Sequence, residues 1–123
     1  MSTKSKVLKV SIAHGAAVSE AFDCRGWVGM EVICTSAGWT TADLGLKVSP
    51  NADGTFYPHF KQDSTLAALD GFTYGRSYFF PADLFPSRWV KLWSTDGATS
   101  PADVNQAPGA GLTRDFIVIL KGY

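Results

Sequence analysis

The sequence predicts an all-β protein, an antiparallel β-sandwich of two sheets with seven to eight strands in a jelly-roll-like arrangement. Apolar residues occur in short runs that alternate with polar residues, which is the period of a strand with one buried face. Gly, Pro, Asn, Asp and Ser interrupt these runs at intervals near ~8–12 residues, a spacing typical of sandwiches and barrels. No stretch sustains the period of an amphipathic helix.

The first half of the chain contains three alternating strands. Their inward-facing residues are expected to be Leu8, Val10 and Ile12, then Val28, Met30, Val32 and Cys34, then Leu44, Leu46 and Val48. Residues 50–54 follow the third strand and form a predicted hairpin loop. Within it Asp53 and Gly54 are expected to supply the positive φ that a tight reversal requires.

The second half predicts two short aromatic-rich strands, at residues 56–61 and 77–80, and two longer ones. Val90 and Leu92 alternate with larger or charged residues. The run 116–120 is continuously apolar, which indicates either a central strand covered on both faces or a strand whose outer face meets a partner. The dipeptides at 70–71 and 96–97, both Asp-Gly, predict further turns. Residues 98–111 form the one long predicted loop.

A chain of 123 residues predicts one domain. We assign it to residues 10–123, preceded by an N-terminal arm at residues 1–9 that leads into the first strand; residues 1–6 have no partner strand in view. Eleven basic and eleven acidic residues cancel, which argues against a nucleic-acid or anionic-membrane binder. The arm carries Lys4, Lys6 and Lys9, and two interpretations stay open for it: it lies along an acidic partner surface, or it is a frayed terminus. No apolar run approaches the length of a membrane span.

The polar residues do not assemble into a recognisable reactive motif. Cys24 and Cys34 are expected to be free thiols, because no secretion signal precedes them. His14 and His59 lack further ligands at metal-binding spacing. The chain has neither a nucleophile elbow nor a phosphate-binding glycine loop. We therefore expect no enzymatic activity, no catalytic residue, no bound metal and no cofactor.

Two of the four tryptophans are the most informative side chains. Trp89 and Trp93 lie four residues apart on one predicted strand, so they share a face with Lys91. If Val90 and Leu92 face the core, this face points outward. Core packing, a protein interface and a sugar-binding platform all remain open for it. The candidate protein interface consists of Trp93, Trp89, Lys91, Lys4 and Lys6.

Five segments in order resemble a group of small virion proteins of tailed bacteriophages and prophages. The segments are residues 10–22 (VSIAHGAAVSEAF), 37–44 (AGWTTADL), 48–56 (VSPNADGTF), 88–94 (RWVKLWS) and 104–107 (VNQA), and the match covers roughly residues 10–120. Position 93 often carries a charged residue in that group. The tryptophan here therefore implies a contact particular to this protein.

The resemblance implies a non-enzymatic β-sandwich in the virion. The expected role is a capsid decoration or cement protein, made in the host cytoplasm and bound to the capsid exterior. Its partners would be the major capsid protein and, in a dimer or trimer, further copies of itself. Alternatives are a head-fibre or tail component, a carbohydrate-binding module that uses exposed tryptophans, and a small hydrolase with paired carboxylates.

Overall fold

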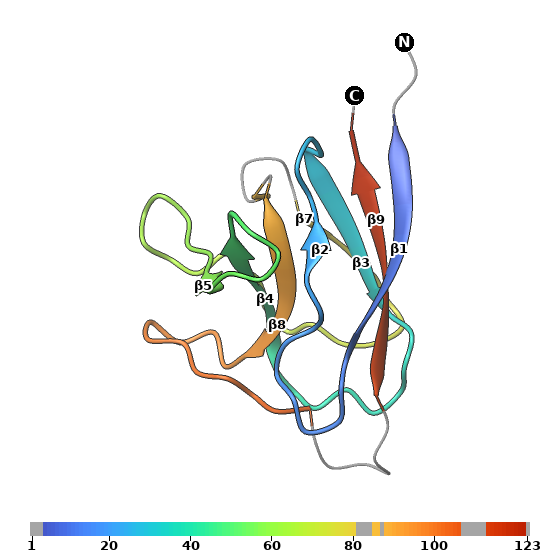
Figure 1. Cartoon of the computed structure of the whole chain (residues 1–123). Coiled ribbons are helices and arrows are strands. Elements are labelled where there is room, and N and C mark those ends of the chain that lie inside the picture. The colour runs from blue at the N-terminus through green and yellow to red at the C-terminus, as the bar shows by residue number, and fades with distance from the viewer. Residues whose placement is uncertain (1–3, 81–84, 87, 107–112, 123) are drawn as a thin grey trace.

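The computed structural model describes residues 4–80, 85–86, 88–106 and 113–122 and places two β-sheets face to face (Figure 1). Within those residues the chain forms nine strands and no helix. The strands are β1 (Ser5–Ile12), β2 (Phe22–Asp23), β3 (Gly29–Cys34), β4 (Asp43–Ser49), β5 (Tyr57–Pro58), β6 (Ala68–Leu69), β7 (Ser77–Phe80), β8 (Trp89–Thr95) and β9 (Arg114–Lys121).

Sheet A has the strand order β1-β9-β3-β7, and sheet B has the order β2-β8-β4-β5, with β6 also paired to β4. Every strand pair is antiparallel, so the predicted two-sheet antiparallel sandwich is confirmed. The chain crosses from sheet to sheet at most connections, while the jelly-roll-like arrangement stays a prediction. The first and last strands pair along eight residues. Both described chain ends therefore lie together, where the Gly122 amide donates to the Lys4 carbonyl at 2.9 Å.

The core lies between the sheets and follows the alternation of the strands. Fully or nearly fully buried side chains include Val10, Ile12, Met30, Val32, Cys34, Leu44, Leu46, Val48, Val90, Leu92, Phe116, Val118 and Leu120. This confirms the inward faces predicted from the sequence, although Leu8 and Val28 are only half-buried. Cys24 and Cys34 are buried thiols that form no disulfide, and the missing disulfide was predicted.

Strand β9 occupies the interior of sheet A but is not covered on both faces. Phe116, Val118 and Leu120 point into the core, while Ile117 and Ile119 remain half-exposed on the outer face. The two-sided cover predicted as one option is wrong for the isolated chain, since sheet B lies on one side only. The other option, an outer face that meets a partner, stays a prediction.

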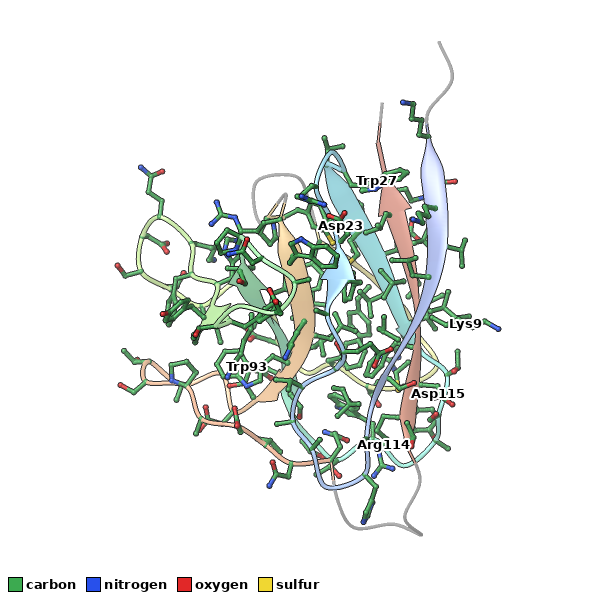
Figure 2. All side chains as sticks on the ribbon, viewed as in Figure 1. Lys9, Asp23, Trp27, Trp93, Arg114 and Asp115 are labelled. Atoms are coloured by element: carbon green, nitrogen blue, oxygen red, sulfur yellow. The ribbon has the colours of Figure 1, made fainter. Side chains whose placement is uncertain are left out.

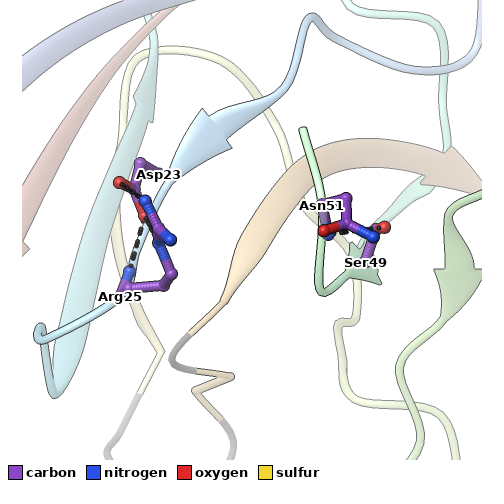
Figure 3. A network of polar contacts seen from close by, with 4 residues as sticks. All are labelled: Asp23, Arg25, Ser49 and Asn51. Atoms are coloured by element: carbon purple, nitrogen blue, oxygen red, sulfur yellow. Dashed lines mark hydrogen bonds and ion pairs between the residues drawn. The ribbon is translucent and has the colours of Figure 1, made fainter. Parts of the chain in front are cut away.

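The turn glycines fall into two kinds. Gly71 and Gly97 have φ angles of 64° and 70°, as predicted for Asp-Gly turns. Gly54 was also expected to have a positive φ angle, but its φ angle is not positive. A Cβ at Gly54 would instead lie 2.8 Å from Ser49 Oγ, which accepts the Asn51 amide at 3.1 Å (Figure 3). Close approach of the backbone therefore explains this glycine.

The predicted N-terminal arm is shorter than expected. Ser5 and Lys6 already pair with Lys121 and Leu120 in sheet A, so the expectation that residues 1–6 lack a partner strand is wrong for these two. The apolar end of β9 supplies the partner, which local sequence around residue 5 does not reveal. Residues 1–3 lie outside the described part of the chain.

Candidate protein-interaction faces

The outer face of sheet B contains the strand that the sequence singled out. Because Val90 and Leu92 point into the core, Trp89, Lys91 and Trp93 point away from it, as expected. Their cross-strand neighbours on β4 are Ser49, Lys47 and Gly45 respectively. Two lysines, at positions 47 and 91, therefore stand directly opposite each other.

Trp93 is not exposed, which corrects its assignment to an interface surface. Its side chain is only 1% accessible, because the chain after β8 folds back over it. Trp93 Nε1 donates to Asp103 Oδ1 at 2.7 Å, and the Lys47 ammonium lies 4.8 Å from the ring centroid. A Cβ at Gly45 would lie 3.2 Å from the ring, so glycine there makes room for the indole. Figure 2 shows Trp93 between sheet B and this covering segment.

The fold-back is fixed by backbone pairing. The Val104 amide donates to the Ser94 carbonyl at 2.9 Å, and Thr95 forms an isolated antiparallel bridge with Asp103. Thr95 Oγ1 also donates to the Ala102 carbonyl at 2.8 Å. The first part of the predicted long loop thus packs on its own chain. Residues 107–112 of that loop lie outside the described residues.

Trp89 and Lys91 remain half-buried and form a surface that we call the basic-aromatic face, composed of Arg25, Lys47, Phe56, Trp89 and Lys91. The Arg25 guanidinium lies 5.4 Å from the Trp89 ring centroid, and the Lys91 ammonium lies 4.7 Å from that of Phe56. Each cation is therefore held against a flat apolar surface. Sequence analysis missed Arg25, Lys47 and Phe56, because their proximity depends on strand register.

Arg25 is fixed further by Asp23. Two side-chain hydrogen bonds of 2.9 Å join the guanidinium to the Asp23 carboxylate, as Figure 3 shows. These bonds lower the pKa of Asp23 to about 2. The charge of Lys6 also lowers this pKa, but Lys6 itself lies on β1 in sheet A, not on the strands of this face. Lys4 lies elsewhere, where a Cβ at Gly122 would contact both it and Trp27.

The outer face of sheet A is a second surface, which we call the apolar face. It consists of Val7, Ile33, Phe79, Ile117 and Ile119. Val7 and Phe79 are 62% and 53% exposed. The apolar run at 116–120 was the one sequence signal for this face, since nothing local marks Val7 or Phe79 as its neighbours.

A shallow hollow of about 400 Å³ lies at one corner of the apolar face. It is lined by Lys9, Val10, Ser11, Thr35, Asp115, Phe116 and Ile117. Ser11 Oγ donates to Asp115 Oδ1 at 2.9 Å, and Figure 2 shows Lys9 and Asp115 on this side of the molecule. Short side chains at Ser11 and Thr35 leave the space open.

The remaining chemistry of the described residues is sparse. They contain no group of three or more His, Cys, Asp or Glu side chains arranged to hold a metal ion. They also include no helix with the length and apolar character of a membrane span. All four tryptophans are described; Trp93 is buried and the other three are half-buried, so none of them offers the fully exposed ring that the sugar-binding alternative requires.

No family model, no curated protein and no solved structure gives a significant match to this chain.

Proposed function

We propose that this chain is a non-enzymatic structural protein of a tailed-bacteriophage particle, a decoration protein that binds the outside of the head across seams between capsomers. The ordered motifs over residues 10–120 support the virion assignment. The observation that carries the docking role is the basic-aromatic face, where Arg25 and Lys91 are preset against Trp89 and Phe56. Arginine and tryptophan dominate the energetics of protein interfaces, and preset side chains lose little entropy on binding.

The proposed stabilisation of the head depends on many copies of the protein binding to one shell. One copy needs only modest affinity, because many copies on one shell close many seams at once. Each closed seam resists the outward pressure of packaged DNA. Lysine and arginine on the docking face suit an acidic capsid surface and would make attachment dependent on salt.

The test compares complete particles with particles that lack the protein, both heated or treated with a chelator. We expect the deficient particles to burst sooner, and added wild-type protein to restore their resistance. Lys91→Glu should fail to restore it. This variant places a carboxylate opposite Lys47 in the ladder, which favours folding, so lost rescue reports lost docking.

Lys61→Glu makes the same charge change on an exposed loop residue and should rescue fully. Equal survival of complete and deficient particles would contradict a cement role. Gold labelling of the protein on intact particles separates the alternatives, because label on the tail or on head fibres would replace the decoration assignment by a tail or fibre role.

A further inference from the structure

The apolar face of sheet A carries its side chains in two rows across four strands. The register aligns Val7, Ile119, Glu31 and Phe79 in one row and Lys9, Ile117, Ile33 and Ser77 in the next. Sheets that face water normally present polar residues on the outside. Five apolar side chains in adjacent rows, Val7 and Phe79 among them with more than half their surface exposed, therefore form a contiguous patch of the kind that meets another protein.

The charges on this face are balanced and spatially separated. Lys121 Nζ lies 3.2 Å from Oε1 of Glu31, which stands in the first of these rows, while Lys9 and Asp115 line the hollow. Two cations and two anions make the face complementary to itself. A two-fold interface requires a surface of this kind, because each patch must meet its own copy.

The shape of the face is also self-complementary. The Phe79 side chain is 53% exposed at one corner, with its ring edge beside Gly29: a Cβ at Gly29 would lie 3.7 Å from the ring edge. The hollow of about 400 Å³ occupies the opposite corner. A closed apolar cavity of roughly 150 Å³ already accepts a benzene ring, so this open and partly polar hollow has enough volume for a phenyl group from a second copy.

We infer that the apolar face binds a second copy of this chain about a two-fold axis, with Phe79 of each copy in the hollow of the other. At ideal strand spacings, Phe79 and the hollow lie about 15 Å apart on a diagonal of the face. We place the two-fold axis between the two faces, where it bisects this diagonal. The strands of one copy then cross the strands of the other near a right angle, which is one of the two common ways for sheets to pack.

The same two-fold axis also brings other residues of the two copies together. Ile33 and Ile119 lie near it, so each meets its own counterpart. Lys9 of one copy reaches Glu31 of the other. Four strands of roughly six residues cover about 400 Å² of face on each copy, about half of what a stable interface of standard size buries per partner. The dimer is accordingly weak in dilute solution and is favoured where copies are concentrated.

The inference goes beyond the proposed function, and its test uses purified protein without particles. Sedimentation of the wild type from micromolar to millimolar concentrations should show a monomer–dimer equilibrium. Phe79→Asp should weaken it at least tenfold. Tyr57→Asp is the matched control, since Tyr57 is 62% exposed on sheet B, and it should dimerise like the wild type.

Two more variants test the geometry. Lys9→Glu and Glu31→Lys should each weaken the dimer, and the double variant should recover most of the loss. Ile119→Cys should form a disulfide-linked dimer under mild oxidation, whereas the buried cysteines of the wild type should not. A wild type that stays monomeric at every concentration, or a dimer that Phe79→Asp leaves intact, would overturn the inference. Neither result bears on binding to the head.

Discussion

Gln106 shows how one buried polar side chain joins distant parts of the chain. Its Oε1 accepts hydrogen bonds from the Thr40 amide at 2.8 Å and from Arg114 Nε at 3.3 Å. Its Nε2 donates to the Thr40 carbonyl at 3.0 Å and to Ser94 Oγ at 2.9 Å. The connection between β3 and β4, strand β8 and strand β9 thus meet at one amide. The sequence singled out residue 106 only within the segment 104–107, one of the segments on which the proposed resemblance to virion proteins rests.

We predict that Gln106→Leu lowers the free energy of unfolding by about 3 kcal/mol, because it leaves several buried groups without this partner. Urea denaturation measures the change. Gln62→Leu, at an exposed position, should change stability by less than about 0.5 kcal/mol. Equal effects of the two variants would show that the buried network contributes little.

Cys24 links burial to pH dependence. Desolvation raises the pKa of its thiol from 9.0 to about 12. Between these values the unfolded chain loses the proton while the folded chain keeps it, so the folded state binds more protons. The free energy of unfolding therefore falls as the pH rises above 9.

We predict that this group makes the wild type lose roughly 1 kcal/mol more stability than Cys24→Ala between pH 8.5 and pH 10. Urea unfolding of both proteins at the two pH values gives the difference. Cys34 is present in both proteins, so its own raised pKa cancels. Parallel pH dependence in the two proteins would argue against a strongly raised pKa at Cys24.

At the scale of the element, β9 is the strand on which sheet A depends. It pairs with β1 on one side and β3 on the other. Alternate residues face different environments, because Leu120 is fully buried between the sheets while Ile119 lies half-exposed on the apolar face. Neighbouring apolar residues of similar size should therefore differ in their contribution to stability.

We predict that Leu120→Ala costs about 3 kcal/mol of unfolding free energy, since it leaves a cavity between the sheets. Ile119→Ala should cost less than about 1 kcal/mol when measured at a concentration where the protein is monomeric. Denaturant titration of the two variants provides the comparison. Similar losses at both positions would indicate that the outer face is covered within the single chain.

At the scale of the whole molecule, the two described ends of the chain lie side by side. Lys4 and Gly122 share a backbone hydrogen bond, and Figure 1 shows both ends at the same pole of the sandwich. Pairing the first strand with the last closes sheet A only after the full chain is available. Such non-local pairing is expected to make folding slow, in the range of milliseconds to seconds.

We predict that a circular permutant folds when a short Gly-Ser linker joins the ends and the chain is opened between Ala52 and Asp53. Both residues are exposed in the loop between β4 and β5, where cleavage of the backbone breaks no ladder. Circular dichroism and cooperative urea unfolding should match the wild type. Opening the chain between Val118 and Ile119 instead should abolish cooperative unfolding.

The sequence by itself determined the fold class, the positions of the longer strands and most of their inward faces. These features follow from local rules: period-two alternation fixes which residues share a face, and turn residues mark where strands end. Ile12, Val32 and Leu46 are buried as the alternation predicts.

Tertiary structure alone decided which outward faces stay accessible. Alternation placed Trp93 outward, but the distant segment around Asp103 folds over it. The pairing of Lys6 with Leu120 joined a polar terminus to the opposite end of the chain. Val7 became a neighbour of Ile119, and Phe79 joined the same row on the far side of Glu31, only through register. Burial by a remote segment depends on contacts between residues far apart in sequence, and local periodicity contains no information about them.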